Sequence, residues 1–197
     1  MKQFSFFKST WKHQFCHGGT LRQRRKGRRS RPLSTREPLH CVFKINSDHF
    51  KLRGLRQAQS FQLIHQIVNQ YSRRFHVGVE QISIQSDHLH LLIRSKRRSQ
   101  FHHFFRVVAG QIAQRFEQRS WIVTDTPKKP AKGKSRETQG AGLWRYRPYS
   151  RVVRGYKAYL VVRDYIQLNE QEALGNVPYR KQRLKGMSMR DWEILWS

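Results

Sequence analysis

The stretch Gln85-Ser-Asp-His-Leu-His-Leu-Leu-Ile-Arg94 decides how this sequence of 197 residues is expected to fold. Ser86 and Asp87 form a turn signal, and the apolar run that follows predicts a strand over residues 88–94. Successive strand residues point to opposite faces of a sheet, so His88 and His90 would project together. The other face would enter the core with Leu89, Leu91 and Ile93.

The segments on either side alternate between strand and helix patterns. Period-2 or apolar runs predict strands at 39–45, 77–85 and 144–153, and the pattern of the second slips between Val79 and Ile82, which allows a bulge. Helical spacing predicts helices at 60–75, 99–119 and 155–174, with Ser60 and Ser99 as N-caps and Gly175 ending the third helix.

The order strand-helix-strand-strand-helix-strand, followed by a helix, predicts an α+β fold of the ferredoxin-like, split βαβ kind. Such a fold is an antiparallel sheet with two helices on one face. We expect a basic N-terminal arm over 1–37, a folded domain over 38–175 and a basic C-terminal tail over 176–197. A lysine- and proline-containing loop over 120–142 would interrupt the domain.

The charge of the chain is strongly one-sided. Lysine and arginine number 40 against 12 acidic residues, giving a formal net charge of +28. A polyanion would neutralise this charge, and nucleic acid is favoured over an anionic membrane surface because the sequence has no amphipathic anchor or lipidation signal. Two separated cysteines and the lack of a long apolar run favour a soluble cytoplasmic protein that associates with the nucleoid.

A second element could contribute to the same site as the histidine pair. Tyr165 and Asn169 are one turn apart on the predicted third helix and share a face. If that face lies beside His88 and His90, the two imidazoles and the Asn169 amide could bind Mg²⁺ or Mn²⁺, with Tyr165 next to a bound phosphate. The alternatives are ordinary sheet-surface histidines and a core or interface tyrosine.

These elements, in this order, resemble the single-tyrosine HUH transposases of the IS200-like group, in the branch of REP-associated tyrosine transposases. The resemblance runs from about His17 to Gly175. It is carried by the His88-Leu89-His90 triplet and the Tyr165-x-x-x-Asn169 element. Softer landmarks are His17-Gly18-Gly19, Arg31-Pro32-Leu33, Pro38-Leu39-His40, Phe105-Arg106, Ala109-Gly110, Trp144, Pro148 to Val153 and Ala173-Leu174-Gly175.

The resemblance implies an enzyme that cuts and rejoins single-stranded DNA beside a hairpin. His88, His90 and Asn169 would hold one divalent metal, and Tyr165 would attack a phosphodiester to form a 5′-phosphotyrosine. Asp87 stands where the branch usually has asparagine. This added acidic group could aid the metal or cap the turn, and we expect the turn role. Asn169 replaces the glutamine of the insertion-sequence members, which favours the REP-associated branch.

DNA binding would need phosphate contacts and aromatic surfaces for unpaired bases. The segment after the metal strand is expected to lie near the active site, and three arginines of the predicted fourth strand would share one face. The predicted phosphate contacts are Arg24, Arg25, Lys26, Arg28, Arg29, Arg31, Arg94, Lys96, Arg97, Arg98, Arg145, Arg147 and Arg151.

Other histidines and cysteines are weaker candidates. His40 begins the first strand and is expected to be structural rather than a fourth ligand. His13, Cys16 and His17 form an incomplete zinc set, and His102 and His103 are adjacent on a helix and so face different directions.

Competing functions remain open from the sequence. They are a domesticated hairpin-binding protein without activity, a ribosomal-type RNA-binding protein, and a nicking or replication-initiating enzyme on a related fold. No small-molecule substrate is expected, and the sequence does not decide between a monomer and a homodimer.

Overall fold

The computed structural model describes residues 15–19, 30–47, 51, 54–122 and 142–197. The elements follow the predicted order, with additions at both ends. They are β1 (Cys16–His17), β2 (Leu39–Lys44), α2 (Ala58–Arg74), β3 (Gly78–Ile84), β4 (His88–Arg94), α3 (Arg98–Gln118), β5 (Tyr149–Val152), α4 (Tyr156–Leu174), the 3-10 helix η3 (Arg183–Gly186) and α5 (Met189–Trp196).

The strands form one sheet in the order β1-β5-β2-β4-β3. Every pairing in this sheet is antiparallel. The register between β2 and β4 places Val42 opposite His90 and His40 opposite Leu92. The register between β3 and β4 shifts between Val79 and Gln81, which confirms the bulge predicted there.

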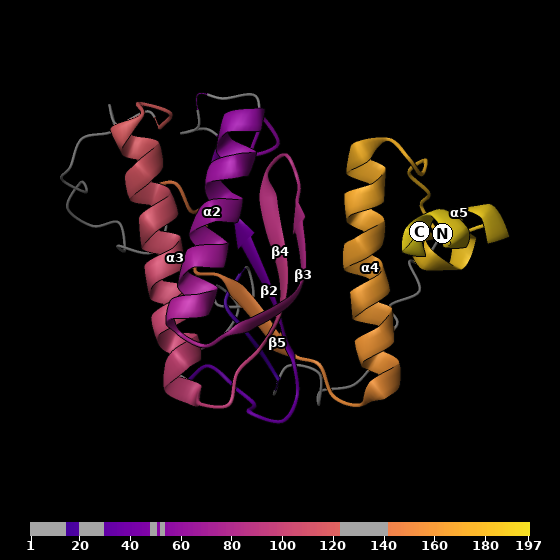
Figure 1. The fold of residues 1–197 in the computed structure, drawn as a ribbon, viewed down its shortest axis with the longest axis horizontal. Coiled ribbons are helices and arrows are strands. Elements are labelled where there is room, and N and C mark those ends of the chain that lie inside the picture. The colour runs from indigo at the N-terminus through magenta and orange to yellow at the C-terminus, as the bar shows by residue number, and fades with distance from the viewer. Residues whose placement is uncertain (1–14, 20–29, 48–50, 52–53, 123–141) are drawn as a thin grey trace, which may run out of the picture.

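Two helices cover one face of the sheet and a third covers the other (Figure 1). α2 and α3 pack on the face that carries Leu89, Leu91 and Ile93, and these side chains are fully buried in the main core. On the opposite face, Leu92 packs with Val153 of the β5–α4 connection and Ile166 of α4. The predicted α+β arrangement with an added C-terminal helix is therefore confirmed.

The helix starts differ from the predicted ones. Ser60 lies inside α2, which begins after Gln57, and its hydroxyl donates to backbone carbonyls including Leu55 O at 3.0 Å. Ser99 lies in the first turn of α3, where Gln100 instead reaches back to accept from the Arg97 N–H at 3.2 Å. Both serine N-cap predictions were wrong, because α2 begins at Ala58 and α3 at Arg98, before each serine.

The predicted fourth strand is shorter than expected. β5 covers only Tyr149–Val152, and Trp144 makes an isolated bridge to Ile45. Pro148 lacks a backbone N–H and stands immediately before the strand. The predicted loop 120–142 lies outside the described residues except at its two ends.

Both predicted extensions contribute ordered elements. Within the N-terminal arm, β1 pairs with the edge strand β5, and Gly18 turns the chain with a φ of +81°. A Cβ at Gly18 would lie 2.2 Å from Pro148 O, so only glycine fits there. The C-terminal tail contains η3 and α5. It follows Gly175, which ends α4 in the left-handed conformation, as predicted.

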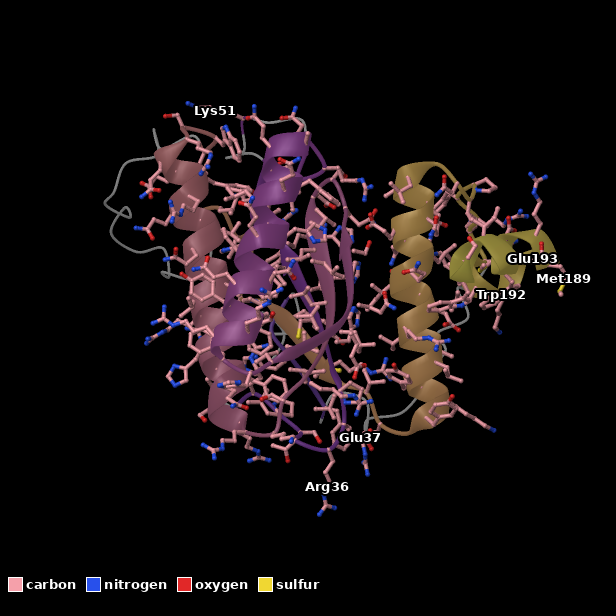
Figure 2. The ribbon with its side chains drawn as sticks, viewed as in Figure 1. Arg36, Glu37, Lys51, Met189, Trp192 and Glu193 are labelled. Atoms are coloured by element: carbon pink, nitrogen blue, oxygen red, sulfur yellow. The ribbon has the colours of Figure 1, made fainter. Side chains whose placement is uncertain are left out.

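The C-terminal helix α5 packs on the outer side of α4. Leu195 is buried with Leu168 and Val177, and Trp192 lies partly buried against them. Figure 2 labels Met189, Trp192 and Glu193 on this helix, on the side of α4 away from the sheet. None of the described helices is long and apolar enough to cross a membrane.

Candidate active site

His88, His90 and Tyr165 meet between the sheet and α4. The two imidazole ring centroids are 4.7 Å apart, and the His90 centroid is 5.7 Å from that of the Tyr165 ring, nearly at right angles. The strand period places both histidines on the face that α4 covers, and the helix period places Tyr165 above them. The structure therefore brings together residues separated by some seventy-five positions in sequence.

Asp87 orients His88. Its Oδ1 lies 2.5 Å from His88 Nδ1, and its Oδ2 lies 3.1 Å from Lys44 Nζ. Burial acts to raise the pKa of this carboxyl, but the hydrogen bonds from His88 and Lys44 hold it below its usual value. With the proton on Nδ1, His88 keeps a lone pair on Nε2. Beyond the turn role expected for it, Asp87 therefore contacts one of the two predicted metal-binding histidines.

His90 is held in a comparable way by another histidine. Its side chain is buried, with Nδ1 3.0 Å from His40 Nε2. The described residues provide no hydrogen-bond partner for His90 Nε2. Burial, followed by the nearby His40, His88 and Arg183, lowers the pKa of His90 to about 2. The ring is therefore neutral at physiological pH, as a metal ligand must be.

Asn169 lies one helical turn after Tyr165, and its residue surface is only 7% exposed. Its backbone carbonyl accepts from Gln85 Nε2 at 2.9 Å. Its side-chain Oδ1 accepts from the Arg183 guanidinium, while its Nδ2 has no partner among the described residues. The amide oxygen that the predicted metal would need is thus bound to a cation in this structure.

Arg183 is a residue of this site that the sequence did not suggest. It begins η3 with a φ of +56° and makes two hydrogen bonds to the Glu172 carboxylate, at 2.7 and 2.8 Å. Its guanidinium also lies 5.4 Å from the Tyr165 ring centroid. In sequence it is one cation of a basic tail, and only the path of the chain after Gly175 brings it to Asn169.

The side chains of His88, His90 and Asn169 could together bind a divalent metal if one condition is met. The described residues contain no group of three His, Cys, Asp or Glu side chains that could hold one. His88 and His90 nevertheless both have Nδ1 engaged, which leaves Nε2 for coordination. An amide oxygen from Asn169 would complete a set suited to Mg²⁺ or Mn²⁺. The condition is that Arg183 releases that oxygen.

The predicted basic cluster after the metal strand lies at the other end of the sheet. Arg94 is six positions after His88 along the strand, which places it about 20 Å away. Arg94 shares the His88 face but donates to Glu80 and, at 3.2 Å, to Arg36 O. Figure 2 shows Arg36 and Glu37 at the end of the molecule opposite Lys51. The expectation that Arg94, Lys96, Arg97 and Arg98 lie near the active site was wrong.

The three arginines of the predicted fourth strand do not share a strand face. Only Arg151 lies in β5, opposite His40 and on the face that carries the imidazoles. Arg145 and Arg147 precede the strand, and the Arg145 guanidinium lies 5.4 Å from the Tyr146 ring centroid. Of these three, Arg151 is the one that the register places toward the site.

Arg31 joins the body of the protein. Its guanidinium donates to Ser150 Oγ at 2.5 Å and Pro148 O at 2.9 Å, and it lies 4.8 Å from the Phe105 ring centroid. A phosphate would have to compete with these partners. The remaining predicted arm contacts lie outside the described residues: Arg24, Arg25, Lys26, Arg28 and Arg29.

The two neutral histidines predict that acid weakens the metal-free protein. Burial, then Arg151, lowers the pKa of His40 to about 4, and that of His90 is lowered to about 2, whereas unfolded histidines titrate near 6.5. Below about pH 6.5 the unfolded chain binds more protons, so the free energy of unfolding falls, by up to ~1.4 kcal/mol per pH unit for each histidine.

Urea unfolding in EDTA at about pH 7 and pH 5 measures this loss. His40→Gln should reduce the loss between the two pH values, because one of the two neutral histidines is gone. An equal loss in the variant and the native protein would contradict the assignment.

The fold is similar to that of a known protein. A solved REP-associated tyrosine transposase bound to a REP hairpin is similar at 15% identity and a TM-score of 0.54, covering 85% of this chain and 91% of that chain. A candidate transposase from Deinococcus radiodurans R1 is 14% identical with a TM-score of 0.39, covering 74% and 98%. A search of curated proteins found no match. The first likeness supports the fold.

The family assignment rests on a separate match. Residues 38–169 match the protein family described as "Transposase IS200 like". The matched segment contains β2 through β5, the triplet at His88–His90 and α4 as far as Asn169. Because the match spans more than half of the chain, this protein belongs to the IS200-like transposase family.

Proposed function

We propose that this transposase cuts and rejoins single-stranded DNA beside a hairpin, with Tyr165 as the nucleophile and His88, His90 and Asn169 as the metal ligands. The observation that carries the proposal is the contact of Tyr165 with His90, whose free Nε2 faces no partner among the described residues. A hairpin substrate is supported by the bound REP hairpin in the similar solved structure.

The chemistry is a reversible exchange of phosphodiester bonds. Tyr165 Oη would form a bond to the scissile phosphorus while the bond to the 3′ oxygen breaks, and the proton lost by the phenol would be balanced by protonation of the departing 3′-hydroxyl. Rejoining by another 3′-hydroxyl would reverse these steps and restore the phenol. When bound, Mg²⁺ or Mn²⁺ would polarise the phosphate and offset its developing charge.

A covalent-adduct assay tests the proposal. The protein is incubated with hairpin DNA copied from the flanks of its own gene, with Mn²⁺ or with EDTA, and separated on a denaturing gel. A protease-sensitive shifted band that requires metal is the expected result. Tight hairpin binding without any band would exclude the enzymatic proposal.

One observation favours a second candidate, a hairpin-binding protein without activity. The Arg183 guanidinium holds the Asn169 oxygen that the metal would need. If Arg183 keeps its hydrogen bond to Asn169 Oδ1 when metal and DNA are present, the protein would bind DNA without cleaving it. The adduct assay separates the two candidates.

Arg183→Gln is expected to tighten Mn²⁺ binding about 5- to 10-fold, because the guanidinium and the metal compete for Asn169 Oδ1. Electron paramagnetic resonance of free Mn²⁺, titrated with DNA-free protein, measures the dissociation constant. Arg180→Gln is a matched control, because Arg180 belongs to the same tail but pairs with Asp191 at 2.7 Å.

The freed Glu172 carboxylate could also attract Mn²⁺. The double variant Arg183→Gln/Glu172→Gln removes this contribution and should keep the tighter binding. An unchanged dissociation constant in both variants would show that Arg183 does not compete with the metal.

A further inference from the structure

His40 and His90 form a close imidazole pair on the α4 face of the sheet. His40 lies on β2, diagonally across from His90 on β4, since the register pairs Val42 with His90 and His40 with Leu92. The rings stack with centroids 5.2 Å apart and an interplanar angle of 11°. His40 Nε2 lies 3.0 Å from His90 Nδ1, which is hydrogen-bond distance.

The direction of this hydrogen bond decides whether His90 can bind a metal. A neutral imidazole carries one proton and one lone pair on its two nitrogens. If His40 Nε2 donates, the proton of His90 is on Nε2, and that nitrogen has no lone pair to offer. If His90 Nδ1 donates, His40 Nε2 accepts, and the lone pair of His90 is on Nε2.

The surroundings favour the second direction. In the first direction His90 would place an N–H at Nε2, which is buried and has no acceptor among the described residues. His40 is therefore suited to accept, with its own proton on Nδ1.

We propose that His40 is a positioning residue, which accepts the Nδ1 proton of His90 and thereby presents His90 Nε2 to the metal. This inference rests on the proposed function. It gives each metal-binding histidine its own partner, since Asp87 accepts from Nδ1 of His88. In this proposal His40 does not bind the metal itself, because its Nε2 is hydrogen-bonded to Nδ1 of His90.

His40→Leu keeps an apolar group of similar size on the strand and removes the acceptor. Loss of such an outer-shell partner lowers metal affinity about 10- to 100-fold. His40→Gln returns an amide oxygen near the position of Nε2 and should rescue most of the affinity. His102→Leu is the control for losing any histidine, because His102 is exposed on α3, across the sheet from the site.

Two measurements test the proposal. Nitrogen-15 NMR of the imidazoles in EDTA reports which nitrogen of His90 is protonated, with its signals assigned from the spectrum of His90→Ala. Mn²⁺ titration followed by electron paramagnetic resonance gives the dissociation constant. Thermal unfolding of each variant shows that the fold is kept.

The expected result is a proton on Nδ1 of His90 in the native protein and in His40→Gln. His40→Leu should move the proton toward Nε2 and weaken Mn²⁺ binding, while His102→Leu changes neither. A His90 tautomer that is the same in His40→Leu as in the native protein would overturn the proposal.

Failure of the proposed function would look different. In that case the native protein would bind no Mn²⁺ and form no adduct. The tautomer measurement needs neither metal nor DNA, so it still decides whether His40 sets the proton position on His90.

Discussion

Replacing Tyr165 by phenylalanine is expected to abolish the covalent DNA adduct and to lower strand cleavage at least about 1,000-fold, because phenylalanine lacks the hydroxyl that the proposal assigns as the attacking group. The ring of Tyr165 stands against His90 and Arg183, contacts that phenylalanine preserves. Hairpin affinity and thermal stability should therefore stay close to those of the native protein. The readout is the shifted band on a denaturing gel together with the rate of strand cleavage.

Tyr159→Phe provides the matched control. Tyr159 lies on the same helix but beside Arg94, at the end of the sheet away from His88. The Arg94 guanidinium is 5.4 Å from the centroid of its ring. This variant should form the adduct at the native rate. If cleavage survived in Tyr165→Phe but was lost in Tyr159→Phe, the nucleophile would be Tyr159 and the assignment of Tyr165 would be wrong.

Replacing His90 by alanine is expected to weaken Mn²⁺ binding by on the order of 100-fold and to remove adduct formation. His90 supplies the buried Nε2, and a site with fewer than three converging ligands holds a divalent metal poorly. Mn²⁺ titration and the adduct gel measure the two effects. Hairpin binding should persist, because phosphate contacts of the basic residues supply most of that affinity.

His90→Ala could lower stability through the space that it leaves in the core. His88→Ala avoids this difficulty because the His88 side chain is 29% exposed, and it should give the same loss of metal and adduct. Native Mn²⁺ affinity in a folded His88→Ala protein would contradict the assignment of this pair as ligands.

Much of the fold could be predicted because it depends on local periodicity. Leu39, Cys41 and Phe43 alternate along β2, and all three are fully buried. The same alternation placed the histidine pair on the face opposite Leu89 and Leu91. The end of α4 at Gly175 was also correct, because a left-handed residue at a helix end strongly favours glycine.

The errors concerned where two helices begin and how far apart neighbouring segments lie. The serines at 60 and 99 have good N-cap chemistry, yet each lies inside its helix. The arginine group from Arg94 to Arg98 follows the metal strand closely in sequence, but an extended strand carries it away from the site. Sequence proximity was a poor guide to spatial proximity here.

The sequence by itself determined the order of elements, the face shared by His88 and His90, and the pairing of Tyr165 with Asn169 on one turn. These depend on the strand and helix periods, which act over a few residues. Only the tertiary structure decided that α4 covers that face, that His40 holds His90 and that Arg183 holds Asn169. Those contacts join residues far apart in the chain, and their geometry follows from how the sheet, α4 and the C-terminal segment pack together.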